Sequence, residues 1–221
     1  MIKSINSNMQ IGILGSGVVG QQLGIGFTKI GHEVKIGTRD SSKLNDWLKI
    51  VNEKGSVGSF EETAKFGEVI IIATLWEGTE NAIKLAGLEN FTNKVVIDVT
   101  NPLDFSQGVP PRFVVSVGNS GGEIIQRMLA DSKVVKAFNF VSAYIMCNPK
   151  RDGGMPTFFV AGNDEEAKKL VMEFAKDFGW EEIIEMGNIE QAFWLECLAM
   201  FWINYGFKNN NWTHAFKLLK K

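Results

Sequence analysis

Three glycines with Gly-x-Gly-x-x-Gly spacing, at positions 15, 17 and 20, could cradle a phosphate group near the start of the chain. They follow an apolar, strand-like run and open a segment with helical spacing. In a dinucleotide-binding turn, Gly15 permits the tight turn, Gly17 lets the backbone approach the pyrophosphate, and Gly20 admits close helix packing. The amides of the helix N-terminus would face the phosphates. The alternative is a structural turn that only joins strand to helix.

The segment after the second predicted strand, Gly37-Thr38-Arg39-Asp40, bears on the choice between NAD and NADP. An acidic side chain there binds the ribose 2′-hydroxyl of NAD and would repel a 2′-phosphate. Thr38 can donate a hydrogen bond, Arg39 can clamp a phosphate, and Lys43 adds a second cation one turn further on. This pattern favours NADP(H). The alternative is an NAD enzyme in which Asp40 binds the ribose and both cations are merely solvated.

Two further segments are candidates for the cofactor's edge, because ligands of such sheets sit beyond the carboxyl ends of the strands. Each of them follows a predicted strand. An alternative of about equal weight is that Trp76 is a packing residue and Asn101-Pro102 an ordinary turn. The candidate residues are Thr74, Leu75, Trp76, Asn101 and Pro102.

Few side chains could move a proton during catalysis. The chain has two histidines; we expect His32, in the turn before the second strand, to be structural, and His214, in the polar tail, to lie at the surface. Lys136 could reach the site, but a lysine at the start of a strand is usually solvated, and Cys197 is expected to be buried and inert. This scarcity suits hydride transfer between two cofactors that the protein mainly positions. No catalytic or metal-binding residue is assigned.

Short β-branched runs alternate with helical patterns in the first half of the chain. The runs at 69–73 and 95–99 are nearly unbroken apolar stretches, as strands need when helices cover both faces of a parallel sheet. The alternation predicts an α/β fold, a Rossmann-type, doubly wound, mainly parallel sheet. The predicted strands are 10–14, 34–36, 69–73 and 95–99, and the predicted helices are 18–30, 43–52 and 77–85.

The second half continues the pattern, with a capping box at Ser120 and Glu123 that marks a helix start. We expect residues 1–145 to form an NADP-binding Rossmann domain and 146–221 a smaller C-terminal α/β portion packed on it. The apolar stretch 192–205 contains Glu196 and is too short to span a membrane, so we expect a buried or dimer-interface helix. The remaining predicted elements are strands 114–117, 134–138, 157–161 and 180–185 and helices from Ser120, from Asp164 and over 189–207.

Composition places the 221-residue chain in the globular range, with 45% hydrophobic and 22% charged residues. Its 23 Lys and Arg nearly balance 25 Asp and Glu, so the net charge of −2 argues against nucleic acid or an anionic membrane as partner and favours a small molecule. Two cysteines and an N-terminus with no signal-peptide pattern favour the cytoplasm.

Four segments together resemble the NADPH-dependent deazaflavin reductases, also called coenzyme-F420-dependent NADP oxidoreductases. The chain is equally similar to the cytosolic reductase domain of the STEAP metalloreductases, a likeness shared by Met186-Gly187-Asn188 with Ala192, Glu196 and Met200. The resemblance runs from about Gln10 to Met200, and the tail from Ile203 has no clear match. The four segments are Ile11 to Gly17, Ile36 to Arg39, Asp98 to Pro102, and Val134 to Asn139 followed by Ser142-Ala143.

The resemblance implies that Ser16, Gly17, Val18 and Val19 contact the pyrophosphate and that Ala137 lies beside the nicotinamide. It also implies that Thr38, Arg39 and Lys43 hold the 2′-phosphate. Family members pass hydride between NADPH and a deazaflavin or flavin ring, so no residue need act as an acid or base. Deazaflavin reductases tend to carry histidine at the position of Asn139, where metalloreductase domains carry asparagine. The acceptor, an 8-hydroxy-5-deazaflavin coenzyme or FMN or FAD, therefore stays open.

Two other functions stay open beside an NADPH-dependent deazaflavin or flavin reductase. One is a reductase of a small carbonyl or imine substrate, with Lys136 or a tyrosine as acid. The other is a non-catalytic NADP(H) sensor that binds a partner, or a second copy of the chain, through the apolar face of 192–205.

Overall fold

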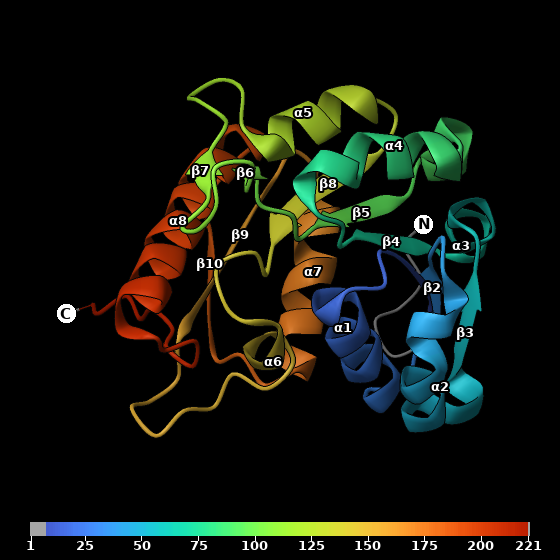
Figure 1. Cartoon of the computed structure of the whole chain (residues 1–221), viewed down its shortest axis with the longest axis horizontal. Coiled ribbons are helices and arrows are strands. Elements are labelled where there is room, and N and C mark those ends of the chain that lie inside the picture. Colours follow the sequence, from blue (N-terminus) through green and yellow to red (C-terminus); the bar gives the residue numbers. More distant parts are fainter. Residues whose placement is uncertain (1–7, 221) are drawn as a thin grey trace.

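The computed structural model describes residues 8–220 and contains an eight-stranded sheet that runs through the whole molecule (Figure 1). The strand order is β10-β9-β8-β5-β4-β1-β2-β3. Every neighbouring pair is parallel except β8 and β9, which are antiparallel. The predicted doubly wound, mainly parallel α/β fold is confirmed. The strands of this sheet are β1 (Gln10–Leu14), β2 (Glu33–Gly37), β3 (Gly55–Gly58), β4 (Val69–Ile72), β5 (Val95–Asp98), β8 (Lys133–Ala137), β9 (Thr157–Gly162) and β10 (Glu182–Glu185).

Helices cover both faces of the sheet (Figure 1). One buried cluster joins it to α1 (Val18–Lys29), α2 (Asn45–Val51), α6 (Ala143–Met146) and α7 (Glu165–Asp177). A second cluster, on the opposite face, joins it to α3 (Phe60–Phe66), α4 (Trp76–Ala86) and α5 (Gly121–Met128). The helix α8 (Ala192–Asn209) packs against α5 and against β8 and β9. Short 3₁₀ turns lie at Ser41–Leu44, Asn52–Lys54, Leu88–Phe91 and Ile189–Gln191.

The strand register explains why the site forms at one edge of the sheet. Leu14 pairs with Gly37 on one side and with Ile72 on the other, and Ile72 in turn pairs with Asp98. The carboxyl ends of these parallel strands are therefore level, and the loops that follow them meet at a common edge. Gly15, Thr38, Thr74 and Thr100 begin or lie in those loops.

The predicted strand at 114–117 is wrong. In this region the chain leaves the main sheet, and β6 (Leu103–Asp104) pairs with β7 (Arg112–Phe113) in a separate two-stranded antiparallel sheet. Val114 and Val117 are 47% and 73% exposed, so their β-branched side chains do not fill a sheet core. Sequence reasoning also left out β3, β6, α3 and α6, which are short elements of two to seven residues.

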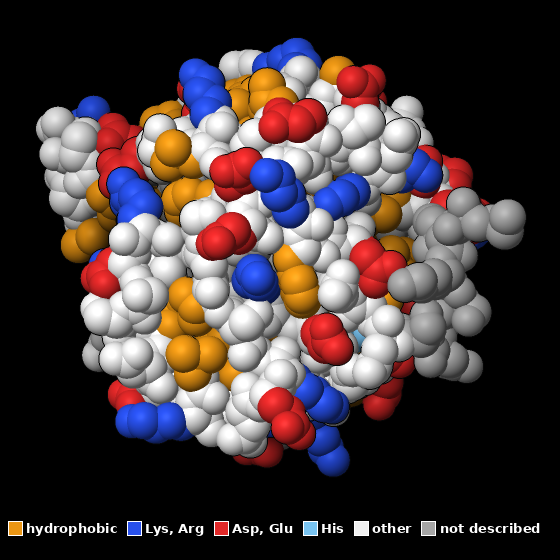
Figure 2. Space-filling model, turned by 90° about the vertical axis from the view of Figure 1, so that its right-hand side faces the viewer, with side chains coloured by type: hydrophobic (Ala, Val, Ile, Leu, Met, Phe, Trp, Pro, Cys, Tyr) orange, Lys and Arg blue, Asp and Glu red, His pale blue; other side chains and the backbone are white. Residues whose placement is uncertain are grey.

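The C-terminal part adds β9 and β10 to the same sheet, and one buried cluster runs across both halves. The boundary that we expect at residue 145 falls within α6 and stays a prediction. No helix within residues 8–220 is both long and apolar enough to cross a bilayer. Acidic and basic side chains are interspersed over the face that carries β3 and its neighbouring helices (Figure 2). The N-terminal segment, which shows no signal-peptide pattern, lies outside the described residues up to residue 7.

His32 is buried at the far edge of the sheet, and the expected structural role is confirmed. Its Nδ1 accepts a hydrogen bond from the amide of Met9 at 3.1 Å. The ring packs against Phe27 and Phe174, with centroid distances of 5.8 and 5.4 Å. Burial lowers the pKa of His32 below 6.5, against the opposing effects of Asp177 and Glu68.

We expect this buried imidazole to make the fold sensitive to mild acid. Because the pKa of His32 is lower in the folded chain than in the unfolded one, the unfolded state gains the proton first, and the free energy of unfolding should fall as the pH drops below about 6.5. Urea unfolding between pH 5 and 8, compared with His32→Gln, measures this. The substitution should flatten the profile, and parallel profiles for both proteins would contradict the assignment.

Candidate functional site

A cavity of about 420 Å³ lies at the carboxyl edge of β1, β2 and β4, where sequence reasoning expects a dinucleotide. Its walls come from the glycine turn, the start of α1, the loop after β2 and the start of α4. It brings together eight of the residues predicted from the motifs near β1 and β2. The lining residues are Gly15, Ser16, Gly17, Val18, Val19, Thr38, Arg39, Asp40, Lys43, Phe60, Ala73, Thr74, Leu75, Glu77, Gly78, Asn81 and Ala82.

The three glycines of the turn meet different steric demands. Gly15 has φ +122°, and a side chain there would overlap the carbonyl of Ala73. A side chain at Gly20 would overlap the carbonyl of Gly15. At Gly17, apart from the adjoining backbone and its two chain neighbours, no described atom lies within 4 Å of the position that a Cβ would take, so the fold leaves that space open. This opening faces the cavity and fits the close approach of a pyrophosphate.

The N-terminus of α1 is open to an anion. Its N-cap residue is Gly17, which offers no side-chain cap, and its first turn contains no acidic residue. By contrast, α3, α5 and α7 are capped by Ser59, Ser120 and Asp164. The uncapped amides and the helix dipole of α1 together form a ready anion site.

The loop after β2 places two cations beside this helix end. The Thr38 hydroxyl lies 2.9 Å from that of Ser16 and so ties this loop to the glycine turn. Arg39 is exposed and makes no hydrogen bond or ion pair with another residue of the described chain. Lys43 lies 3.9 Å from Asp40 and is also largely exposed. An unpaired guanidinium and a nearby ammonium are suited to a phosphate.

The carboxylate of Asp40, which sequence reasoning considered as a ribose ligand, is already engaged. Its Oδ1 accepts hydrogen bonds from the Ser42 amide at 3.1 Å and the Ser42 hydroxyl at 2.6 Å. These bonds lower the pKa of Asp40, so it remains an anion at neutral pH. The carboxylate caps the 3₁₀ turn of Ser41–Leu44, which weighs against the NAD alternative.

Two more cavities continue the cleft beyond the strand ends. One, of about 330 Å³, contains Thr74, Leu75, Trp76 and Asn101 in its wall. The other, of about 630 Å³, contains Asn101 and Asn139 and extends to α6, α8 and the C-terminal tail. Val19 lines all three cavities and thus marks their junction.

Sequence reasoning missed much of the 630 Å³ cavity, the largest of these three. Its wall includes Val99, the segment Val141 to Met146, and Arg151, together with Trp202 and Ile203 of α8 and Trp212 and Thr213 of the tail. Among these residues, the segment Val141 to Met146 comes soon after β8, so Asn139, just beyond the end of that strand, was the one available indication of this wall. Nothing in the local sequence indicates that the tail returns to this edge.

Ala137 and Pro102 are buried and line none of these three cavities. Ala137 ends β8 with its side chain in the core. The next residue, Phe138, has φ +64°, a strained conformation for a bulky side chain. Its ring is held by Phe158, with centroids 4.7 Å apart. This turn carries the chain from the core into the cleft, where Asn139 lies.

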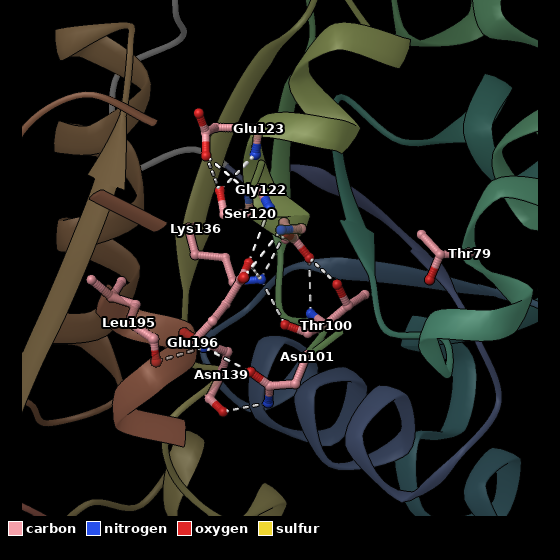
Figure 3. Close-up of polar contacts among 12 residues, drawn as sticks. Thr79, Thr100, Asn101, Ser120, Gly122, Glu123, Lys136, Asn139, Leu195 and Glu196 are labelled. Carbon is pink, nitrogen blue, oxygen red and sulfur yellow. Dashed lines mark hydrogen bonds and ion pairs between the residues drawn. The ribbon is translucent and has the colours of Figure 1, made fainter. Parts of the chain in front are cut away.

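The side chain of Lys136 is fully buried, so the expectation of a solvated lysine is wrong. Its Nζ contacts Asp98 Oδ2 at 2.9 Å, Glu196 Oε1 at 2.8 Å and the Thr100 carbonyl at 2.7 Å (Figure 3). Burial alone would lower the pKa of Lys136, but the two carboxylates outweigh it and raise that pKa. Lys136 is therefore a permanently charged structural residue that links Asp98, Glu196 and the Thr100 carbonyl, and not a proton donor. It lines none of the three cavities.

The same polar cluster links α8 to the cleft. Glu196 accepts hydrogen bonds from the amides of Gly121 and Gly122 at the start of α5, both at 3.0 Å. Asp98 Oδ1 accepts bonds from the amide and hydroxyl of Thr100. The turn that contains Asn101 is thus held in place by the buried charges of Asp98, Lys136 and Glu196 (Figure 3).

Two other expectations outside the cleft can be compared with the structure. His214 is half-buried rather than solvated, because its ring stacks on Trp202 and its nitrogens lie 2.9 and 3.1 Å from the carbonyls of Asn211 and Trp202. Cys197 is partly buried, and burial raises the pKa of its thiol, which makes it a poor nucleophile.

Together, the fold and the site place the protein in the class of NADP-binding α/β oxidoreductases. A reductive aminase of Aspergillus terreus, in complex with NADPH and ethyl levulinate, shares the fold with a TM-score of 0.64 at 14% identity, and the match covers 92% of this chain and 63% of that protein. A pyrroline-5-carboxylate reductase of Coxiella burnetii matches with a TM-score of 0.66 at 15% identity over 92% of this chain and 68% of its own. These likenesses concern the fold alone.

The chain belongs to the F420-dependent NADP reductase family. Residues 10–102 match the family described as NADP oxidoreductase, coenzyme F420-dependent. The F420-dependent NADP reductase of Methanocaldococcus jannaschii is 30% identical over 90% of this chain and 93% of its own. The crystal structure of a candidate F420-dependent NADP reductase of Arthrobacter sp. FB24 matches with a TM-score of 0.90 and 34% identity over 96% of this chain and all of its own.

The second predicted resemblance is also confirmed. The metalloreductase STEAP3 of Rattus norvegicus is 27% identical over 86% of this chain, which spans 36% of that longer protein. Both of the families expected from the sequence motifs are therefore relatives of this chain.

Proposed function

We propose that this protein transfers hydride between NADP(H) and a deazaflavin of the F420 type. The observation that carries the proposal is the junction at Val19, where a cavity suited to phosphates opens into a large, mostly apolar chamber. The family relationship favours the deazaflavin over FMN or FAD as the ring that enters that chamber. NADPH would supply the hydride, and the acceptor would take that hydride together with one proton from solvent.

The residues of the glycine turn and the start of α1 would hold the pyrophosphate, and the loop after β2 would hold the 2′-phosphate. The open space at Gly17 and the uncapped N-terminus of α1 support the first assignment. Arg39, which pairs with no other residue in the described part of the chain and has Thr38 and Lys43 beside it, supports the second. Thr74, Leu75, Trp76, Asn101 and Asn139 would border the ribose and nicotinamide, with Ala137 and Pro102 supporting them from the core.

No side chain is required as a proton donor in this proposal. Lys136, the acid considered for a carbonyl or imine reductase, has its ammonium bound to Asp98, Glu196 and the Thr100 carbonyl. The chain would instead act by holding two rings in contact and by excluding water around them.

We also propose that it acts in the cytoplasm, and that a dimer would use α8, where Phe201 is 65% exposed.

Absorbance spectroscopy tests the proposed function. Purified protein is mixed with NADPH and with the deazaflavin coenzyme, FMN or FAD in turn, and the nicotinamide absorbance is followed. We expect turnover that is fastest with the deazaflavin. Turnover of none of the three above background would refute the proposal, and NADPH binding without turnover would favour the sensor alternative.

Two alanine substitutions in one turn separate cofactor binding from folding. Gly17→Ala would place a methyl group where the pyrophosphate approaches, so we expect the Kd for NADPH to rise by about tenfold, or ~1.4 kcal/mol. Its stability should change by about 1 kcal/mol or less, because Gly17 provides no side-chain cap that the substitution could remove. Gly20→Ala forces a methyl group onto the Gly15 carbonyl and should cost about 1–3 kcal/mol of stability.

Calorimetric titration and urea unfolding of both variants give these values. Gly17→Ala that bound NADPH as tightly as the unaltered protein would show that the turn only joins strand to helix.

A further inference from the structure

The 630 Å³ cavity beyond Val19, called the chamber here, has a wall built from distant parts of the chain. One side is the start of α1 and the turn at Val99 and Asn101, and the other is α8 with the C-terminal tail. The tail is docked by main-chain bonds, because the Thr157 amide donates to the Phe216 carbonyl and the Leu218 amide donates to the Thr157 hydroxyl, both at 2.9 Å. The wall is therefore a built part of the fold.

Two polar atoms in this wall are buried without a hydrogen-bond partner: Asn139 Oδ1 and Arg151 Nε. Across the described residues, one other side-chain atom, Thr63 Oγ1 on α3, shares that condition. An unmet buried hydrogen-bonding group costs about 1–3 kcal/mol, so such groups are rare and call for an explanation. Two of them in one cavity indicate a ligand that satisfies both.

The free atom of Asn139 is an acceptor. Its Nδ2 donates to Asn101 Oδ1 at 2.9 Å and to the Leu195 carbonyl at 3.1 Å, which uses both amide hydrogens and fixes the orientation of the amide (Figure 3). Asn139 is 4% exposed. Its Oδ1 can therefore accept a bond from an N–H or O–H group of a molecule inside the chamber.

Arg151 gives the chamber a positive charge. It forms no ion pair with another described residue, and its one hydrogen bond donates from Nη1 to the neighbouring carbonyl of Lys150. No Asp or Glu lines the chamber. A guanidinium with a free Nε–H and no competing carboxylate binds phosphate or carboxylate groups well.

The tail and α8 together supply an aromatic part of the chamber wall. Trp212 packs against α8 at Gly206, where a side chain would clash with its ring, and lies 5.3 Å from Trp202 between ring centroids. Both tryptophans line the chamber. Two large aromatic surfaces suit a planar heterocycle.

We propose that Arg151 determines acceptor specificity in this chamber, selecting a planar heterocycle whose side chain carries an anionic phosphate or carboxylate group. Asn139 Oδ1 accepts a hydrogen bond from the heterocycle, and Trp212 with Trp202 contacts its face. The inference rests on the proposed function for the identity of the ring, because the chamber opens at the same junction as the NADP(H) cavity.

Steady-state kinetics with two acceptors test the role of Arg151. The deazaflavin coenzyme carries an anionic side chain, and its riboside lacks that charge. We expect Arg151→Met to raise the KM for the coenzyme by about tenfold, as for loss of one charge-assisted hydrogen bond. The KM for the riboside and both kcat values should stay within about twofold. Arg151→Lys, which keeps the charge but lacks the Nε–H, should retain part of the preference for the coenzyme.

Equal losses for coenzyme and riboside, or no loss for either, would overturn the proposal. NADPH titration serves as the control, since Arg151 lies outside the cavity of the glycine turn and that affinity should not move. Thermal unfolding should show no loss of stability, because Arg151→Met removes an unmet buried group. Trp212→Ala provides the contrast, because loss of the aromatic surface should weaken both acceptors alike.

A separate outcome distinguishes this inference from the proposed function. If the unaltered protein turns over no deazaflavin, the proposed function fails, and equilibrium titration with FMN and riboflavin then tests the chamber alone. A preference for FMN that Arg151→Met abolishes would still support the anion subsite. The same affinity for both flavins in both proteins would overturn it.

Discussion

Arg39→Ala is expected to weaken NADPH binding by about 10- to 100-fold while leaving NADH binding nearly unchanged. The guanidinium is exposed, has no ion-pair partner within residues 8–220 and lies next to Thr38 and Lys43 at the cavity, so its charge-assisted bonds to a phosphate would contribute about 1.5–3 kcal/mol. NADH has no 2′-phosphate and makes none of these bonds, so its affinity should hardly change. Calorimetric titration of both cofactors measures the two affinities.

A matched control is Lys49→Ala, which removes an exposed cation of α2 that pairs with Asp46 instead of facing the cavity. This variant should bind both cofactors normally. If Arg39→Ala weakened NADPH and NADH to the same extent, Arg39 would not be the phosphate clamp, and Asp40 would have to be reconsidered as a ribose ligand.

Lys136→Met is expected to destabilise the fold by about 3–5 kcal/mol, because two buried carboxylates would lose their shared cation. For a chain of this size that corresponds to a fall in Tm of roughly 6–20 °C. The raised pKa means that Lys136 stabilises the fold throughout the neutral range and loses this effect only as the pH rises above about 10.5. Differential scanning calorimetry of the variant checks the loss.

Lys133→Met on the same strand is the control. Lys133 pairs with Asp164 at 3.1 Å but is about one-third exposed, so its loss should cost less than about 1 kcal/mol. Glu196→Gln added to Lys136→Met should recover part of the stability, since it removes one of the stranded charges. A Lys136→Met protein of normal stability that had lost all turnover would instead identify Lys136 as a proton donor.

The sequence predicted those parts of the site that depend on neighbours along the chain. The glycine turn, Thr38 and Arg39 follow strands whose apolar patterns were clear, and parallel strands bring their carboxyl ends to one edge. Lys136 was misjudged because its partners Asp98 and Glu196 lie in other elements, and a strand pattern does not show which charges meet in the core.

The chamber was largely hidden from sequence reasoning for a related reason. Arg151 lies in an irregular segment without a pattern, and Trp212 belongs to a tail that returns to the cleft only through contacts with α8 and β9. The false strand at 114–117 arose because alternating valines fit a strand locally, although the chain there loops away from the sheet. Features that depend on neighbouring residues in the chain could be predicted, whereas features that depend on contacts between distant segments could not.

Transfer of deuterium tests the central claim most directly. NADPH carrying deuterium at nicotinamide C4, in each of its two stereochemical forms, is oxidised by the protein with the deazaflavin coenzyme as acceptor, and the reduced coenzyme is analysed by mass spectrometry. Direct hydride transfer between two rings held in one cleft predicts that one form passes its deuterium to the deazaflavin and the other does not. Absence of deuterium from the reduced deazaflavin with both forms would contradict the account.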